Sequence, residues 1–154
     1  KEKSLILRTA WLHGSYGNNF LKTMVKLFKE KSEVKVVNDQ FGSPTWTGWL
    51  AEAILDLGRL NVNGIMNAAC EGGASWYDFS LEVFEAAKDE ISFNSELKIL
   101  PQSTSECARP AKRPRYSVLN CNRLSEALGR KPITWQEGVR RHLNEIISMT
   151  KELV

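Results

Sequence analysis

The chain has 154 residues, of which 42% are hydrophobic and 25% are charged, and its formal net charge at neutral pH is +3. This composition is typical of a soluble globular protein with one core, and so mild a charge gives little support to nucleic-acid binding. No apolar run is long enough to span a bilayer, and no signal peptide is recognisable. The three cysteines lack paired metal-ligand spacing and predict reduced thiols in a cytoplasmic protein, not a disulfide framework or a zinc site.

The first apolar run, from Leu5 to Leu7, predicts a buried strand over about 4–9. A strand buried on both faces needs neighbours on both edges. Because Lys1 lies only a few residues before it, we expect this chain to be the later part of a longer protein. The segment 10–20 follows with glycines, asparagines and aromatic residues, and α/β proteins commonly bind their ligands in such a loop after a strand.

The next segments have the periodicity of regular structure. Apolar residues at helical spacing predict an amphipathic helix from about 19 to 31. Asn18 or Asn19 would cap this helix, or would contact a ligand near the positive end of the helix dipole. Alternating valines over 34–37 predict a half-buried strand, which a polar loop follows.

A second helix is predicted from about 47 to 60, followed by a strand over 64–67. Ser75 and Asp78 form a capping-box pattern that predicts the start of a third helix, and a last strand is expected over 97–100. The expected core residues of the second helix and its entry are Trp46, Trp49, Leu50, Ala51, Ala53, Ile54 and Leu57.

Two helices are predicted near the end of the chain. Asn120 is a candidate cap for a short helix that Gly129 would end, and Thr134 begins a capping box for a final helix ending near 150. The resulting alternation of strands and helices predicts an α/β fold in which helices cover a mainly parallel sheet.

Complete catalytic motifs are missing from the sequence. It contains no Gly-x-Gly-x-x-Gly turn, no Tyr-x-x-x-Lys pair and no assignable Ser-His-Asp set. His13 lies in the first loop, where it could touch a ligand, whereas His142 sits among charged residues of the last helix and is expected to face solvent. The sequence therefore predicts a binding surface and no complete active site.

The most basic stretch runs from Cys107 to Ser117 and carries four positive charges without an acidic residue. Arg109 and Arg113 each precede a proline, which favours an extended backbone for both. Extended arginines suit a bidentate contact with phosphate. The alternative interpretation is a basic loop that only faces water.

Five segments resemble, in order and spacing, the C-terminal half of the dTDP-4-dehydrorhamnose reductases, a family of extended short-chain dehydrogenases. They are RTAWLHG at 8–14, GNNF at 17–20, DQFGSPT at 39–45, SWYDF at 75–79 and AKRPRYSVL at 111–119. The resemblance implies the C-terminal part of a Rossmann fold, with two strands of the main sheet plus a small α/β substrate-binding domain. It also implies that an N-terminal Rossmann half, absent from 1–154, supplies the Tyr-x-x-x-Lys pair and most of the NADPH or NADH site.

The resemblance assigns roles to individual residues. It places Thr9 and Ala10 near the nicotinamide, Trp11 against the hexose, Asn19 and Arg113 near the diphosphate, and Gln40 in the substrate pocket. A tryptophan face packs well on a deoxysugar, and an arginine fork neutralises diphosphate charge. The other basic residues of the loop are expected at the rim or in solvent: Arg109, Lys112 and Arg115.

The implied function is that of the sugar-nucleotide-binding portion of an NADPH-dependent reductase, which reduces the 4-keto group of dTDP-4-dehydrorhamnose to give dTDP-L-rhamnose. The chain alone is then expected to be inactive. Its expected partners are the dTDP-sugar and its own N-terminal half, with a homodimer possible and neither nucleic acid nor membrane involved. The alternative is a non-catalytic sugar-nucleotide-binding or regulatory relative with the same fold.

Overall fold

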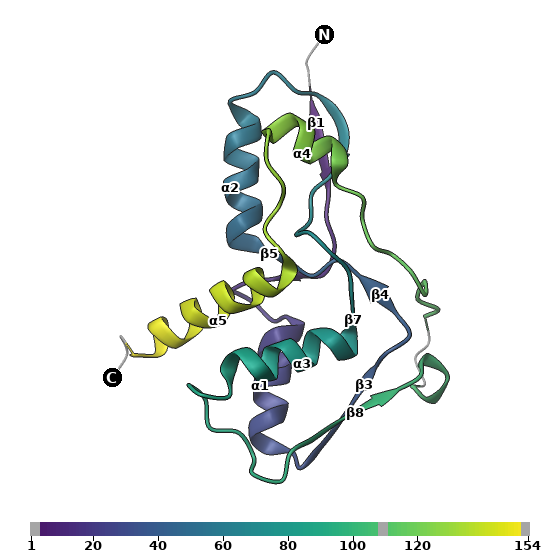
Figure 1. Cartoon of the computed structure of the whole chain (residues 1–154), viewed down its shortest axis with the longest axis vertical. Helices are drawn as coiled ribbons and strands as arrows, with labels where there is room; N and C mark the ends of the chain where they lie inside the picture. The colour runs from purple at the N-terminus through teal and green to yellow at the C-terminus, as the bar shows by residue number, and fades with distance from the viewer. Residues whose placement is uncertain (1–3, 108–110, 152–154) are drawn as a thin grey trace.

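The computed structural model describes residues 4–107 and 111–151 of the chain (Figure 1). The predicted helices and the four longer strands form in the predicted order, and four two-residue strands that the sequence analysis did not predict lie between them. The strands are β1 (Leu5–Arg8), β2 (Leu12–His13), β3 (Glu33–Val37), β4 (Phe41–Gly42), β5 (Thr45–Trp46), β6 (Gly64–Asn67), β7 (Ala74–Ser75) and β8 (Lys98–Gln102). The helices are α1 (Phe20–Glu30), α2 (Thr47–Gly58), α3 (Trp76–Ala87), the 3₁₀ turn η1 (Thr104–Glu106), α4 (Asn122–Leu128) and α5 (Trp135–Lys151).

Two parallel ladders form the main β structure. β1 pairs with β6, with Leu5 opposite Gly64, and β3 pairs with β8, with Glu33 opposite Lys98. The shorter β2–β5 pair is parallel and the β4–β7 pair is antiparallel. Each sheet in the described part of the chain has two strands, so the expectation of one mainly parallel sheet is wrong although the parallel pairing itself is confirmed.

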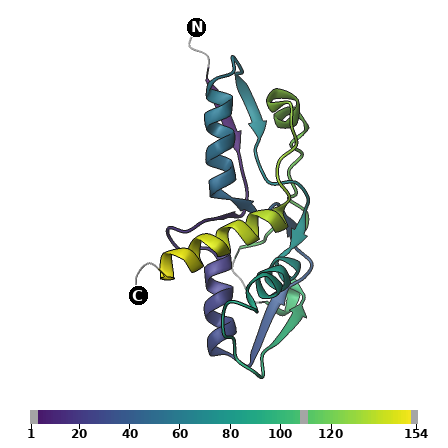
Figure 2. The ribbon, with the colours of Figure 1, turned by 60° about the vertical axis from the view of Figure 1, so that its left-hand side comes forward.

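The two ladders lie at opposite ends of an elongated molecule (Figures 1 and 2). One end contains β1, β6, α2 and α4, and the other contains β3, β8, α1 and α3. Helix α5 crosses between them and packs on α3 and on β5. No helix in the described residues is both long and apolar enough to cross a membrane.

Local capping residues set several helix ends. The Asn19 side chain accepts a hydrogen bond from the Lys22 amide at 3.1 Å and begins α1. Ser75 and Asp78 form the reciprocal capping box of α3, in which each side chain accepts from the backbone N–H of the other residue. These caps confirm the predicted starts of both helices.

The termini of α4 follow the prediction only in part. Gly129 ends the helix in the left-handed region with φ of 65°, which suits a residue without Cβ. At the start, Cys121 holds the N-cap position, so the prediction of Asn120 as the N-cap is wrong. The Asn120 side chain instead accepts from the Asn122 amide at 2.9 Å, one residue before the cap.

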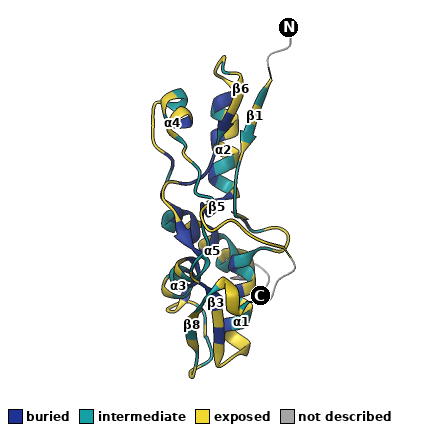
Figure 3. Ribbon diagram, turned by 90° about the vertical axis from the view of Figure 1, so that its right-hand side faces the viewer, coloured by how far each residue is buried: buried dark blue, intermediate teal, exposed yellow. Residues whose placement is uncertain are grey.

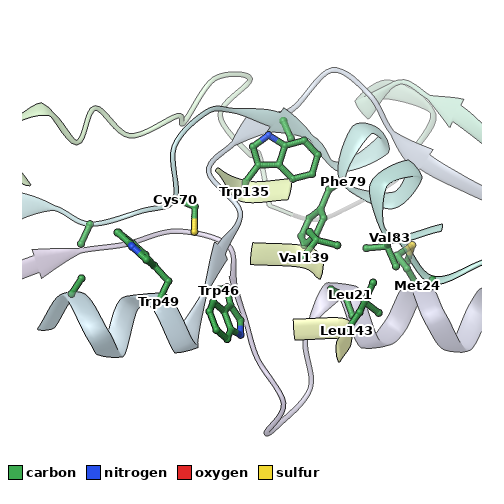
Figure 4. Packing of buried hydrophobic residues seen from close by; sticks show 14 of the residues in the cluster. Leu21, Met24, Trp46, Trp49, Cys70, Phe79, Val83, Trp135, Val139 and Leu143 are labelled. Atoms are coloured by element: carbon green, nitrogen blue, oxygen red, sulfur yellow. The ribbon is translucent and has the colours of Figure 1, made fainter. Parts of the chain in front are cut away.

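One continuous core joins the two ends of the molecule. Figure 4 shows Trp46 and Trp49 on the α2 side, then Trp135, Val139 and Phe79, and then the residues of α1. Trp46 and Trp49 are 7% and 2% exposed, which confirms them as core residues. Because α5 supplies Trp135 and Val139, this helix connects the packing of both ends.

The buried stripe of α2 is narrower than predicted. Trp49, Ala53 and Leu57, four residues apart along the helix, are buried. Ala51 and Ile54 are exposed, with 49% of Ile54 accessible, so these two core assignments are wrong. The helix is apolar around much of its circumference, and composition alone does not indicate which apolar face finds a partner.

The predicted first strand forms, but its burial is one-sided. Leu5 and Leu7 pack against the core, while Ile6 is 54% exposed and its cross-strand neighbour Ile65 is 46% exposed. Figure 3 shows β1 in the colours of exposed and intermediate residues. The expectation of a strand buried on both faces is therefore wrong for this chain, because no described element covers the outer face of the β1–β6 ladder.

Both histidines lie elsewhere than the sequence suggests. His142 is fully buried, because α5 turns this position toward β2, so the expectation that it faces solvent is wrong. His13 is 1% exposed and its ring packs near Phe79, so it is not positioned to touch a ligand.

Candidate functional site

A pocket of about 430 Å³ lies between α1, β3 and the chain that follows β8. Its walls combine apolar side chains from the helix and the strand with polar and cationic side chains from the segment after β8. The residues that line it are Phe20, Thr23, Met24, Leu27, Val34, Lys35, Val36, Val37, Gln40, Trp76, Gln102, Thr104, Cys107, Ala111, Lys112 and Arg113. An apolar wall beside a cationic rim suits a ligand with a flat or apolar body and an anionic group.

Gln40 is held in this pocket by a short polar network. Its Nε2 donates to Thr104 Oγ1 at 3.0 Å, and Thr104 in turn donates to Asp39 Oδ1 through its hydroxyl at 2.5 Å and its amide at 3.0 Å. These bonds to Thr104, above all that from its hydroxyl, lower the pKa of Asp39, so Asp39 stays an acceptor. Because the Thr104 proton goes to Asp39, Thr104 must accept from the Gln40 amide group, which leaves the Gln40 carbonyl oxygen for a ligand.

The basic loop reaches the same pocket because it is tied to β4. Phe41 donates its amide to the Arg115 carbonyl at 2.8 Å, and Ser117 donates its amide to the Phe41 carbonyl at 2.8 Å. This extended pairing brings Arg113 to the pocket wall together with Gln40. Arg113 is exposed there, and its guanidinium makes no ion pair with a described residue.

The remaining basic residues of the loop differ in their positions. Lys112 lines the pocket beside Arg113 and is exposed, and Arg115 is exposed close enough to Asp39 to favour the charged carboxylate. The predicted rim position of these two residues fits their exposure. Arg109 lies outside the described residues.

Asn19 begins α1 next to the pocket residue Phe20. Its Oδ1 accepts from the Lys22 amide, and its Nδ2 donates to the Gly14 carbonyl at 2.8 Å. The capping interpretation is therefore confirmed. Contact between Asn19 and a diphosphate stays a prediction, and both polar atoms of its side chain already have a protein partner.

Thr9 and Ala10 follow the carboxyl end of β1, the edge at which parallel α/β sheets bind ligands. The Thr9 hydroxyl oxygen is buried and has no hydrogen-bond partner in the described residues. A buried, unpaired hydroxyl is costly unless a ligand or another segment meets it, so this end of β1 fits a polar group such as a nicotinamide. The contact itself stays a prediction.

Trp11 is not part of the pocket lining. Its indole stacks on that of Trp76, with ring centroids 3.5 Å apart and planes within 9°. Trp76, which does line the pocket, is a site residue that the sequence analysis used only as part of a motif. Thr104 was also missed, since its contact with Gln40 joins segments far apart in the chain. The available sequence signal for Trp76 was its position as the first residue of α3, directly after the N-cap Ser75.

Comparisons with known proteins bear on the family and the fold of the chain. The family model described as RmlD substrate binding domain matches residues 1–148. Over 156 residues the chain is 37% identical to dTDP-4-dehydrorhamnose reductase of Escherichia coli K12, covering 96% of this chain and 51% of that protein. It is 40% identical over 142 residues to the spore coat polysaccharide biosynthesis protein SpsK of Bacillus subtilis, covering 92% of this chain and 47% of that protein.

Solved structures give the same result for the fold. A crystal structure of dTDP-4-dehydrorhamnose reductase from Bacillus anthracis in complex with NADP superposes with a TM-score of 0.82 at 37% identity, covering 92% of this chain and 48% of that one. A UDP-glucose 4-epimerase from Thermotoga maritima shares the fold at 17% identity with a TM-score of 0.71. The expected α/β fold of extended short-chain dehydrogenase type is thus confirmed. The chain spans about half the length of the curated relatives it matches, and it belongs to the RmlD substrate binding domain family.

Proposed function

We propose that this chain is the sugar-nucleotide-binding half of an NADPH-dependent reductase that converts dTDP-4-dehydrorhamnose to dTDP-L-rhamnose. The pocket between α1, β3 and the basic loop supports this proposal most directly, because it places Arg113 and Lys112 beside an aromatic and aliphatic wall. A nucleotide sugar has the matching parts, an anionic diphosphate and a flat base. The family membership and the reductases among its relatives support the same substrate class.

Each part of the pocket has a role in this proposal. Arg113 and Lys112 bind the diphosphate, since a guanidinium fork matches phosphate oxygens and an ammonium adds charge. The free carbonyl oxygen of Gln40 accepts an N–H from the ligand. The Thr9 hydroxyl, which has no partner in the described residues, lies at the end of β1, where the nicotinamide is proposed to contact the chain.

The chain contributes orientation to the reaction. NADPH, when bound, supplies the hydride that reduces the C4 carbonyl. The residues of this half hold the diphosphate and the base, so that the sugar at the other end of the ligand has a fixed position. Because the sequence has no Tyr-x-x-x-Lys pair, the proton for the carbonyl oxygen comes in this proposal from the N-terminal half.

The β1–β6 ladder is the proposed contact with that N-terminal half. Ile6 and Ile65 lie side by side on its outer face and are 54% and 46% exposed. Neither strand has a second partner strand within the described residues. The outer edge of β1 is therefore open to a further strand, whereas on the β6 side the Ile65 carbonyl accepts from Arg123 Nη1 at 2.9 Å. A Rossmann sheet that continues past β1 would pair this edge, and helices of that half packed on the sheet would cover the isoleucines.

The test is a calorimetric titration of the chain with dTDP and dTDP-rhamnose, repeated for Arg113→Ala. We expect binding by the original chain and a loss of about tenfold in affinity for the variant, because a charge-assisted contact with the diphosphate disappears. Arg59→Ala is the matched control, since Arg59 is an arginine with an 80% exposed side chain at the C-cap of α2, at the other end of the molecule. Equal affinity for all three proteins would contradict the assignment of the pocket.

A second experiment tests the reaction. The full-length protein is expected to oxidise NADPH in the presence of the keto-sugar, and the chain alone is expected to be inactive. A full-length protein that binds dTDP-rhamnose but never oxidises NADPH would instead support a non-catalytic sugar-nucleotide-binding relative.

A further inference from the structure

The parallel ladder of β3 and β8 brings a polar network together at one edge of the pocket. The ladder ends with Val37 opposite Gln102. The same register carried two residues further sets Asp39 opposite Thr104, in the segments that leave the two strands at the same end. Thr104 and Gln40 both line the pocket. The register of the ladder therefore decides which side chains meet here, although they are far apart in the sequence.

The turn η1 fixes the backbone on the Thr104 side of this network. The amide and the hydroxyl of Ser103 both donate to Glu106 Oε2, at 2.6 and 2.7 Å. This cap holds the start of the turn. The amide of Thr104 donates to Asp39 Oδ1 at 3.0 Å, and its hydroxyl donates to the same oxygen at 2.5 Å. One carboxylate oxygen thus takes both hydrogen-bond donors of Thr104.

Asp39 fixes the direction of every hydrogen bond in the network. An ionised carboxylate can only accept, so the Thr104 hydroxyl gives its proton to Asp39, and its oxygen accepts from Gln40 Nε2 at 3.0 Å. A glutamine amide without such a partner can rotate by half a turn, which exchanges its oxygen and its nitrogen. Here that rotation would set the Gln40 carbonyl oxygen against the Thr104 oxygen with no proton between them. The network therefore keeps the Gln40 carbonyl oxygen as the group that is free to meet a ligand.

A locked acceptor distinguishes only those ligand groups that cannot change polarity themselves. A sugar hydroxyl both donates and accepts, so it would bind either orientation of the Gln40 amide. The imide N3–H of thymine is different, because this ring N–H is always a donor at neutral pH. It is also the one N–H group in a dTDP-sugar. A cytosine ring has the opposite polarity at the same position, where N3 is an acceptor.

We propose that Gln40 accepts a hydrogen bond from the imide N3–H of the nucleotide base, and that Asp39 and Thr104 are positioning residues that favour this base by holding the Gln40 amide. The inference rests on the proposed function, that a dTDP-sugar binds in the pocket. The apolar side chains of α1 and β3 contact the face of the base, and Gln40 contacts its edge. A polar site of this kind rejects a ligand that cannot complete its hydrogen bond, because the polar group of the protein then stays unpaired.

A matched pair of nucleotides tests the contact. dTDP and 5-methyl-dCDP differ only at ring positions 3 and 4, so they share the diphosphate, the deoxyribose and the methyl group. In calorimetric titrations of the chain we expect dTDP to bind about tenfold more tightly, since 5-methyl-dCDP sets N3, an acceptor, against the Gln40 carbonyl oxygen. Gln40→Met keeps the length of the side chain without the amide, and it should bring the two affinities close together.

Thr104→Val tests the positioning role through a change of specificity. Valine removes the hydroxyl at nearly the same volume, so the Gln40 amide can rotate and donate from Nε2 to N3 of cytosine. We expect this variant to bind dTDP about threefold more weakly and 5-methyl-dCDP about threefold more tightly than the original chain does. Asp39→Ala should change the specificity in the same direction, because the Thr104 hydroxyl can then donate to the Gln40 carbonyl oxygen. General damage to the pocket would not increase either affinity.

Two further variants serve as controls. Thr104→Ser keeps the hydroxyl and should keep the original ratio of the two affinities. Ser105→Ala removes another hydroxyl from the same exposed turn, where Ser105 Oγ contacts Ser103 Oγ at 2.8 Å, and it should also leave the ratio unchanged.

Each result decides one point. Equal affinities of the original chain for dTDP and 5-methyl-dCDP would overturn the contact between Gln40 and the base. If Arg113→Ala still weakens dTDP binding in that case, the proposed function stands. An unchanged ratio in Thr104→Val, whatever the absolute affinities, would overturn the positioning role. A chain that binds neither nucleotide would overturn the proposed function together with the contact.

Discussion

His13 Nδ1 and His142 Nδ1 lie 3.0 Å apart in the core between β2 and α5, and neither side chain is more than 1% exposed. Only one proton fits between two nitrogens at this distance. When both rings are neutral, one is therefore protonated on Nδ1 and the other on Nε2. Both Nε2 atoms are buried without a partner in the described residues. The pair thus holds one unpaired donor and one unpaired acceptor.

We expect two different imidazole tautomers at neutral pH. Long-range nitrogen-15 correlation spectra of the two histidines, assigned by comparison with His13→Gln and His142→Gln, should show one ring of each kind. The same tautomer in both rings would be incompatible with the contact between the two Nδ1 atoms.

The pair should make the free energy of unfolding depend on pH. Burial, the largest cause in each case, lowers the pKa of His13 from 6.5 to about 3 and that of His142 from 6.5 to about 4. Between these values and 6.5 the unfolded chain binds protons that the native chain excludes. The stabilisation is therefore full above about pH 6.5, and it is lost progressively as the pH falls toward the folded values.

Urea unfolding across this pH range measures the effect. Glu145 on α5 and Lys22 on α1 also face His142, with opposite influences on its pKa. Replacing both histidines, His13→Phe with His142→Leu, should flatten the slope between about pH 5 and about pH 6.5. An unchanged slope in this double variant would assign the pH dependence to other groups.

Replacing either of two exposed glycines with alanine should change the free energy of unfolding, in opposite directions for the two positions. Gly129 has a φ of 65°, so a Cβ there strains the backbone although no atom lies within 4 Å of its position. Gly58 is in the last turn of α2 without positive φ, and its Cβ would also meet open space. We expect Gly129→Ala to destabilise by about 1 kcal/mol and Gly58→Ala to stabilise by about 0.5–1 kcal/mol.

Chemical denaturation of the two glycine variants against the original chain provides the measurement. Since neither Cβ meets a neighbour, packing is the same in both and only backbone conformation differs. A stabilising Gly129→Ala would contradict the left-handed cap at the end of α4.

Cysteine labelling should report on the pocket. Cys107 is half-buried in the pocket lining with Arg113, whereas Cys70 is 2% exposed. Burial raises the pKa of the Cys70 thiol to about 11, so little reactive thiolate forms there. We expect iodoacetamide to label Cys107 before Cys70, and dTDP to slow the labelling of Cys107. Peptide mass spectrometry at timed intervals locates the label. If saturating dTDP leaves the rate of Cys107 labelling unchanged, the ligand binds elsewhere.

The elements of this fold were predictable because their signals are local. Asn19, Ser75 and Gly129 set helix ends through contacts within a few residues, and such contacts can be read from spacing. The alternation of Val34 and Val36 likewise marks β3 without information from its partner strand.

The errors concern contacts between distant segments. His142 reads as a residue of a charged helix face, and only the position of β2 makes it a buried partner of His13. The exposure of Ile54 depends on which side of α2 meets the core, which an apolar helix does not specify. The site shows the same difference between local and distant contacts. The motif resemblance suggested Gln40 and Arg113. The stacking of Trp11 on Trp76 joins segments far apart in the chain, and only the structure shows it.

The order of the strands has a consequence for how the chain holds together. β1 and β3 both come before β6 and β8, so the ladder at one end of the molecule interleaves along the sequence with the ladder at the other. A break in the chain anywhere between Val37 and Gly64 therefore puts the two strands of each ladder on different fragments. Because one continuous core also joins the two ends, we expect them to unfold as a single cooperative unit, in which disruption of the β1–β6 ladder also disrupts β3, the strand that lines the pocket.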